Sequence, residues 1–254
     1  MIQRPDTRLA AKLFASPNIE PRKGNVRPSI LLLHYTGMAS AASAIQWLAT
    51  PAAKVSCHYV VDEAGEITQM VAEGMRAWHA GVAHWAGESD INSQSIGIEI
   101  QNPGHDLGYP DFPEAQIAAV IALSRDIVLR NSIPPQRVLA HSDVAPMRKI
   151  DPGEKFPWGQ LAAAGVGFWP AHLPVPVDEA DPGDPAGEGR AIDILDRLAA
   201  YGYGIDRSSE QRVQQHRAMI AAFQRHFRPA RVDGRVDRST IATLDILLEA
   251  LPVS

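Results

Sequence analysis

Short apolar runs in the first two thirds of the chain predict buried strands. Residues 29–36, SILLLHYT, are almost continuously apolar, as in a strand that is covered on both faces. Similar short runs recur further along the chain, and we predict strands at 56–61, 67–71, 95–101 and 137–141. The acid and glycine between the first two of these, in DEAG, are typical of a hairpin turn.

A longer amphipathic stretch at 114–129 predicts a helix. Its apolar residues recur at helical spacing: Ile117, Val120, Ile121, Leu123, Ile127 and Val128. Because strands alternate with helical segments, we expect an α/β domain with a mixed central sheet and flanking helices.

A change of composition near residue 170 predicts a domain boundary. Prolines at 170, 174, 176, 182 and 185 stand among acids and glycines that leave nothing to bury. We therefore predict a large domain at 1–170, a linker at 171–189 and a smaller domain at 190–254.

Three amphipathic segments in the smaller domain predict a small all-α, three-helix unit. The apolar residues of the first two are Ile192, Leu195 and Leu198, then Val213, Ile220, Phe223 and Phe227. Asp237 is the expected N-cap of the third, which carries Ile241, Leu244, Ile246 and Leu247.

Composition excludes several classes of protein. A formal net charge of -5 argues against a nucleic-acid-binding protein, which needs a basic surface. Cys57 is the single cysteine, so an internal disulfide is impossible. No run approaches the roughly 20 apolar residues of a membrane span. The first residues do not resemble a signal peptide, so we expect a cytoplasmic protein, or a periplasmic one if a leader has been removed.

Candidate metal ligands follow two of the predicted strands. His34 and His141 end such strands, and Asp151 precedes a Pro-Gly pair that can turn its carboxylate back toward the sheet. Two imidazoles and one carboxylate would leave one tetrahedral position of Zn²⁺ open, as in catalytic zinc sites. A histidine beside a strand is more often structural, however, and no compact metal signature such as HExxH is present. The interpretation therefore depends on the surrounding residues.

Those surrounding residues resemble the type 2 family of N-acetylmuramoyl-L-alanine amidases, particularly its AmiD-like branch. The matching segments stand in order along the first domain: LLLHYTG at 31–37, VSCHYVVDEAGEI at 55–67, AWHAGVAHW at 77–85, NSQSIGIEIQNPG at 92–104 and HSDVAPMRKIDPGEKFPW at 141–158. The resemblance implies that His34, His141 and Asp151 bind zinc. It also implies that Glu99 is the general base and that Lys149 stabilises the oxyanion, although neighbouring Arg148 could be confused with Lys149.

The same resemblance suggests residues around the metal. Trp78 and His79 are expected to line the substrate groove, and Asn92 to contact the peptide stem. His58 is expected to be structural or to lie behind the ligands. Adjacent strand residues point to opposite faces, so we expect Tyr35 to pack away from His34.

The segment AFQRHFRPARVDGRVDRST at 222–240 resembles the type 1 peptidoglycan-binding module. Together the two resemblances imply hydrolysis of the amide between N-acetylmuramic acid and L-alanine in peptidoglycan fragments. The 1,6-anhydro fragments of wall recycling are the expected substrate, with consequences for β-lactam resistance in some bacteria. The alternatives are a periplasmic amidase acting on polymeric peptidoglycan, a non-catalytic peptidoglycan-recognition module, and a zinc hydrolase of another amide.

Overall fold

A six-stranded sheet forms the centre of the computed structural model, which describes residues 4–170, 187–206 and 211–251. The strand order is β1-β5-β4-β7-β3-β8. The strands are β1 (Lys12–Leu13), β3 (Ile30–Tyr35), β4 (Tyr59–Val61), β5 (Ile67–Gln69), β7 (Ser95–Ile100) and β8 (Val138–Ala140). The five strands predicted from apolar runs are all present in this sheet, with some ends shifted by one to three residues.

Parallel pairing brings the carboxyl ends of β3, β7 and β8 to one edge of the sheet. β3 pairs in parallel with both β7 and β8, and β4 pairs in parallel with β7 but antiparallel with β5. The antiparallel pair is the predicted hairpin. Because neighbours in register share a face, the pairing of His34 with Glu99 places both side chains on the same side of the sheet.

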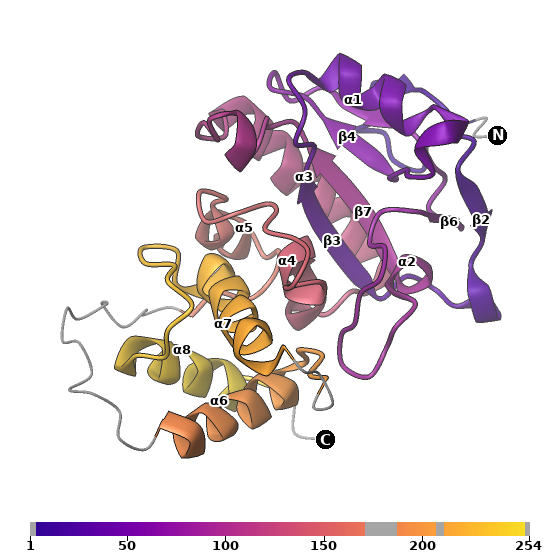
Figure 1. Ribbon diagram of the computed structural model, residues 1–254. Coiled ribbons are helices and arrows are strands. Elements are labelled where there is room, and N and C mark those ends of the chain that lie inside the picture. Colours follow the sequence, from indigo (N-terminus) through magenta and orange to yellow (C-terminus); the bar gives the residue numbers. More distant parts are fainter. Residues whose placement is uncertain (1–3, 171–186, 207–210, 252–254) are drawn as a thin grey trace.

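The two faces of the sheet have different partners. Leu31 and Leu33 of β3 face the buried side of α3 (Glu114–Asn131), the helix predicted at 114–129. Ile30 and Leu32 face the opposite way and belong to a core that includes residues of the C-terminal helices. Figure 1 shows α3 behind the sheet and the C-terminal helices gathered beside α4 and α5. The near-continuous apolar run in β3 therefore reflects burial on both faces.

Smaller elements complete the N-terminal part. β2 (Ile19–Pro21) and β6 (Met75–Ala77) form a separate antiparallel pair. The short helices are α1 (Ala41–Leu48), α2 (Ile91–Gln94), α4 (His141–Val144) and α5 (Trp158–Ala163), and 3-10 turns occupy Lys23–Asn25, Pro51–Ala53, His105–Leu107 and Pro135–Arg137. The predicted strand at 137–141 ends at Ala140, because His141 already begins α4.

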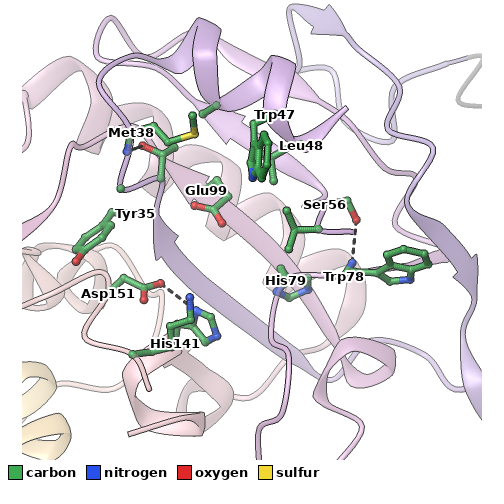
Figure 2. A pocket seen from close by; sticks show the side chains of 15 residues that line it. Tyr35, Met38, Trp47, Leu48, Ser56, Trp78, His79, Glu99, His141 and Asp151 are labelled. Carbon is green, nitrogen blue, oxygen red and sulfur yellow. Dashed lines mark hydrogen bonds and ion pairs between the residues drawn. The ribbon is translucent and has the colours of Figure 1, made fainter. Parts of the chain in front are cut away.

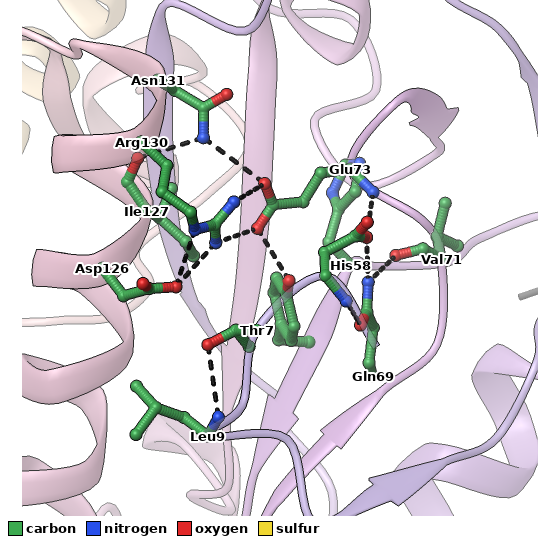
Figure 3. Close-up of polar contacts among 12 residues, drawn as sticks. Thr7, Leu9, His58, Gln69, Val71, Glu73, Asp126, Ile127, Arg130 and Asn131 are labelled. Carbon is green, nitrogen blue, oxygen red and sulfur yellow. Dashed lines mark hydrogen bonds and ion pairs between the residues drawn. The ribbon is translucent and has the colours of Figure 1, made fainter. Parts of the chain in front are cut away.

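A buried carboxylate ties α3 to the hairpin strands. Glu73 accepts hydrogen bonds from both terminal nitrogens of Arg130, at 2.7 and 2.8 Å, and from the Tyr59 hydroxyl at 2.7 Å (Figure 3). Arg130 also pairs with Asp126 one helical turn earlier. This bidentate pairing satisfies the buried charge and fixes the helix against β4.

Three helices form the C-terminal part: α6 (Gly187–Tyr201), α7 (Arg212–Phe227) and α8 (Arg238–Glu249). Asp237 caps α8 by accepting from the Thr240 amide, as predicted. The prediction for Val213 was wrong: its side chain is 73% exposed, because the first turn of α7 lies ahead of the core that Met219, Ile220 and Phe223 enter. Residues 171–186 of the predicted linker lie outside the described residues, and α6 already occupies 187–189.

The C-terminal helices dock onto the sheet domain through polar and aromatic contacts. The buried Asp143 carboxylate of α4 accepts from the Tyr203 hydroxyl at 2.7 Å and contacts Nδ1 of His226 at 2.6 Å. The His226 ring stacks on Trp158, with centroids 3.7 Å apart.

Within the described residues, no helix is both long and apolar enough to cross a bilayer.

Candidate metal centre and active site

Three side chains from separate parts of the chain converge at the edge of the sheet. His34 comes from the end of β3, His141 from the start of α4, and Asp151 from the loop that follows α4. Asp151 Oδ2 lies 3.2 Å from His34 Nδ1 and 3.1 Å from His141 Nδ1, and the two Nδ1 atoms are 2.9 Å apart. The structure thus brings together the three residues that the sequence suggests as ligands.

The hydrogen bonds behind the histidines indicate that their facing nitrogens carry lone pairs. His141 Nε2 lies 3.1 Å from the Ala80 carbonyl oxygen, which can only accept, so Nε2 carries the proton and a neutral ring leaves Nδ1 bare. His34 Nε2 is likewise engaged, with His79 Nδ1 at 3.0 Å. Two bare nitrogens and a carboxylate oxygen repel one another unless a cation lies between them.

The spacing and chemistry of this donor set fit zinc. Ligand bonds of about 2.0–2.1 Å in a tetrahedron separate the donor atoms by roughly 3.3–3.4 Å. The observed separations of 2.9–3.2 Å are slightly tighter than that. Two imidazoles with one carboxylate also suit a borderline metal better than Mg²⁺ or Ca²⁺, which prefer oxygen ligands.

Electrostatics keep these groups in the states that bind a cation. Burial, with the neighbouring His141 adding to it, lowers the pKa of His34 to about 4. Burial alone would raise the pKa of Asp151, but the electrostatic interactions with His141 and His34 outweigh burial and hold that pKa below its usual range. At neutral pH, His34 is therefore neutral and Asp151 is ionised.

Glu99 stands beside the cluster on the same face of the sheet. Its Oε2 atom is buried and has no hydrogen-bond partner among the described residues. Burial, with the charge of Asp151 adding to it, raises the pKa of the Glu99 carboxyl well above its usual value, while Lys149 acts in the opposite direction. A buried carboxylate oxygen without a partner is costly, so it indicates a group that the site is built to receive.

Lys149 and Arg148 have different surroundings. Lys149 lines the pocket together with Glu99 and Asp151. Arg148 donates to the backbone carbonyl oxygen of Ala80 at 3.0 Å and also contacts the carbonyl of Val82. The Arg148 guanidinium is therefore bound to the backbone of the loop at Ala80 and Val82, whereas the Lys149 side chain lines the pocket.

The pocket beside the three converging residues has a volume of about 300 Å³. Figure 2 shows Glu99, His141 and Asp151 at its floor, with Met38, Trp47 and Leu48 along one wall. Trp47 lies on α1 and is 51% exposed. This wall was not predicted from the sequence, because α1 is short and its one available signal was an unexplained tryptophan next to Leu48.

The expected substrate-contacting residues fall into two groups. Trp78 and His79 both line the pocket. Asn92 is not among its lining residues, and its Oδ1 atom accepts from the backbone amides of His79 at 3.0 Å and Ala80 at 2.8 Å. His58 is fully buried behind the site, where Nδ1 accepts from the Gly97 amide at 2.9 Å.

Tyr35 was expected to pack away from the site, but its ring lines the pocket edge near Asp151 (Figure 2). Because β3 ends at this residue, the side chain extends beyond the sheet. Its hydroxyl lies 3.1 Å from His105 Nδ1, and burial together with the charge of Asp151 raises the pKa of Tyr35 to about 12.

Comparison with known proteins identifies the family. A family profile described as N-acetylmuramoyl-L-alanine amidase matches residues 24–154. Over 247 residues the chain is 39% identical to the N-acetylmuramoyl-L-alanine amidase AmiD of Escherichia coli (strain K12), and the alignment covers 88% of this chain and 83% of that protein. The chain belongs to the N-acetylmuramoyl-L-alanine amidase family. The resemblance inferred from the five sequence segments is confirmed.

Further matches extend the likeness of this amidase beyond the first domain. A second profile, for a peptidoglycan binding domain, matches residues 192–244. A structure of E. coli AmiD with anhydro-N-acetylmuramic acid-L-Ala-D-gamma-Glu-L-Lys has a TM-score of 0.76 and 36% identity, covering 91% of this chain and 92% of that one. AmpDh3 from Pseudomonas aeruginosa with an anhydromuramic pentapeptide has a TM-score of 0.75 and 33% identity, covering 92% and 96%. These likenesses confirm the predicted mixed α/β fold and the C-terminal helical region.

Proposed function

We propose that this amidase uses zinc held by His34, His141 and Asp151 to hydrolyse the amide between 1,6-anhydro-N-acetylmuramic acid and L-alanine in peptidoglycan fragments. The observation that carries this proposal is the convergence of two lone-pair nitrogens and a carboxylate oxygen beside the unpartnered oxygen of Glu99. When bound, zinc would polarise the scissile carbonyl and make a water molecule more acidic.

Glu99 is the proposed proton carrier. It stands on β7, directly across from His34 of β3, so the rigid sheet holds its carboxylate beside the metal ligands. The carboxylate takes a proton from the attacking water and returns it to the departing amine of L-alanine. The raised pKa of Glu99 suits this role, since a stronger base accepts the proton more readily.

Lys149 is the proposed source of positive charge for the transition state. Its side chain lines the same pocket as Glu99 and Asp151, close enough for its charge to lower the pKa of Glu99. Attack on the carbonyl develops negative charge on the carbonyl oxygen, and a fixed cation nearby stabilises that charge.

Relatives support the anhydro-muropeptide as substrate, because both AmiD and AmpDh3 have structures with anhydromuramyl peptides. The match of residues 192–244 to a peptidoglycan binding domain favours a second candidate, polymeric peptidoglycan. The first substrate would place the enzyme in wall recycling in the cytoplasm and the second in the periplasm, and cell fractionation distinguishes the two.

The test is a cleavage assay followed by mass spectrometry. Purified protein is incubated with anhydro-muropeptide or with intact sacculi, as wild type, after chelation, and as Glu99→Gln. We expect wild type to release the free stem peptide, chelated protein to release none until zinc is restored, and Glu99→Gln to retain zinc while losing about 10²–10⁴-fold in rate.

Two outcomes would contradict the proposal. If zinc-loaded wild type cleaves neither substrate, the proposed activity is wrong and the recognition-module alternative is favoured. If chelation leaves the rate unchanged, the three converging residues do not hold a catalytic metal. Preferential cleavage of sacculi would instead support the second candidate.

A further inference from the structure

The two histidine ligands are supported from behind by consecutive residues of one loop. His34 Nε2 lies 3.0 Å from the His79 ring nitrogen Nδ1, and His141 Nε2 lies 3.1 Å from the Ala80 carbonyl oxygen. The Nε2 atom of each imidazole, which points away from the proposed metal centre, therefore contacts the same dipeptide, His79-Ala80. A displacement of this dipeptide would turn both rings together.

The donor and the acceptor of each hydrogen bond can be assigned from neighbouring groups that can only donate or only accept. The Ser95 hydroxyl donates to the Ile91 carbonyl oxygen at 2.6 Å, so Ser95 Oγ is free to accept from His79 Nε2 at 3.3 Å. His79 Nδ1 is then bare and accepts from His34 Nε2. The proton on Nε2 leaves His34 Nδ1 with its lone pair directed at Asp151 and His141.

The His79 ring packs directly against the backbone of β7 at Gly97, which has no side chain. A Cβ atom at Gly97 would lie only 2.5 Å from His79 Nδ1 and 2.6 Å from its Cε1 atom. Gly97 is the register partner of Leu32, two residues before His34 on the neighbouring strand. The absent side chain thus gives the imidazole its place between Ser95 and His34.

Asn92 holds the dipeptide in place. Its single Oδ1 atom accepts from the amides of both His79, at 3.0 Å, and Ala80, at 2.8 Å. Asn92 is only 6% exposed and lies on α2, whose last residue is followed directly by β7. This one acceptor therefore fixes the loop that orients both ligand rings to the strand that carries Glu99.

We propose that Asn92 is a positioning residue that sets the orientation of both histidine ligands through His79 and Ala80, rather than a contact for the peptide stem. The inference rests on the proposed zinc site. Groups that hydrogen-bond to metal-binding histidines fix the ring orientation and tautomer, and their loss costs about 10–100-fold in metal affinity or activity.

The test compares zinc affinities of full-length variants by competition with a chromophoric chelator. Asn92→Leu removes the acceptor at similar size, and we expect zinc affinity to fall by about 10–100-fold. Asn92→Asp keeps an oxygen that accepts from both amides, and we expect affinity close to wild type. The visible spectrum after substitution with Co²⁺ should show altered coordination in Asn92→Leu and the wild-type spectrum in Asn92→Asp.

A second pair of variants covers the case in which Asn92→Leu fails to fold. His79→Asn retains an oxygen near the position of Nδ1, whereas His79→Leu does not, so we expect only His79→Leu to lose most zinc affinity. Thermal unfolding of each zinc-free protein identifies a general loss of stability.

The outcomes separate this inference from the proposed function. Wild type that binds no zinc would overturn the zinc site itself. Zinc-binding wild type with folded Asn92→Leu of equal affinity and equal Co²⁺ spectrum would overturn the inference alone. Asn92→Asp that loses as much affinity as Asn92→Leu would also overturn it, because the shared acceptor would then not be the cause.

Discussion

Three residues on one face of β7 determine the shape of the site. Ser95 accepts from His79, Gly97 makes room for the His79 ring, and Glu99 extends its carboxylate beside the proposed metal ligands. The alternation of a strand puts all three on the face that carries His34 in β3. The small residues of SIGIEIQ are therefore as informative as its glutamate.

Gly97→Ala should disturb the site although it adds one methyl group. The new Cβ would overlap the His79 ring, and overpacking of this kind costs about 1–3 kcal/mol of unfolding free energy. We expect zinc affinity to fall as well, since His79 would move from His34. Gly74→Ala is the matched control, because a Cβ there meets nothing within 4 Å. Urea unfolding and chelator competition measure both effects, and equal results for the two variants would contradict the expectation.

Lys149→Met should lower the rate of hydrolysis and leave zinc bound. A single donor to a developing oxyanion contributes about 10²–10³-fold to kcat. Because Lys149 lines the pocket but is not among the three proposed ligands, zinc affinity should change little. Lys23→Met, at a lysine whose side chain is 70% exposed, is the control for loss of positive charge. An unchanged kcat in Lys149→Met would argue against its proposed role.

At the scale of elements, α7 supports the segment that carries two of the three proposed ligands, His141 and Asp151. His226 contacts the carboxylate of Asp143, two residues after His141, and its neighbour Arg225 lies 3.8 Å from Glu154, three residues after Asp151. The Asp143 carboxylate also accepts from the Ala140 amide at 2.8 Å, where β8 ends. The contact between the two parts of the chain is therefore continuous with the backbone of the metal site.

His226→Ala should destabilise the protein by about 2–4 kcal/mol, because it removes a buried hydrogen bond to a carboxylate together with a stacked ring. Tyr203→Phe removes only a hydroxyl donor to the same carboxylate and should cost about 1.5–3 kcal/mol. Tyr201→Phe, at a tyrosine whose ring packs edge-on against Trp85, is the matched control. Chemical denaturation followed by fluorescence and circular dichroism measures the loss of unfolding free energy in each variant. An equal loss in His226→Ala and in the control would contradict the prediction.

At the scale of the whole molecule, buried histidines make the stability of the zinc-free protein depend on pH. Burial and the charge of Arg22 lower the pKa of His58 to about 3 from an ordinary value of 6.5, and the pKa of His34 is lowered to about 4. Below pH 6.5 the unfolded chain therefore binds protons that the folded protein does not. Each of these two histidines should contribute a loss of stability as the pH is lowered from 6.5 toward its folded pKa, by up to about 1.4 kcal/mol per pH unit, whereas the raised pKa of Glu99 contributes in the opposite direction.

His58→Asn isolates one of these contributions. An asparagine oxygen can accept from the Gly97 amide in place of Nδ1 but does not titrate in this range. Urea unfolding with chelator between pH 7 and pH 4.5 should show a slope smaller than that of wild type by about one proton. Identical slopes would mean that His58 titrates normally in the folded protein.

Much of the fold and of the ligand set could be predicted because the signals are local. The apolar run of β3, the alternation of β7, the helical spacing of α3 and the acid at the start of α8 each act within one turn or one strand. His34, Glu99, His141, Lys149 and Asp151 were chosen from short segments that match a family. The structure places the last four in the lining of one pocket and His34 beside His141 and Asp151. The prediction that Val213 is buried was wrong, because periodicity does not reveal where along a helix the core begins.

The sequence by itself determined most of the inward-facing positions of the strands and helices and the family that the chain resembles, since periodicity and short motifs depend on near neighbours. Only the tertiary structure decided that Asn92 turns toward the loop behind the ligands, that Tyr35 reaches the pocket, and that His226 meets Asp143. These contacts join positions up to 83 residues apart. Their formation depends on strand register and on how helices dock, and neither is encoded in any single segment.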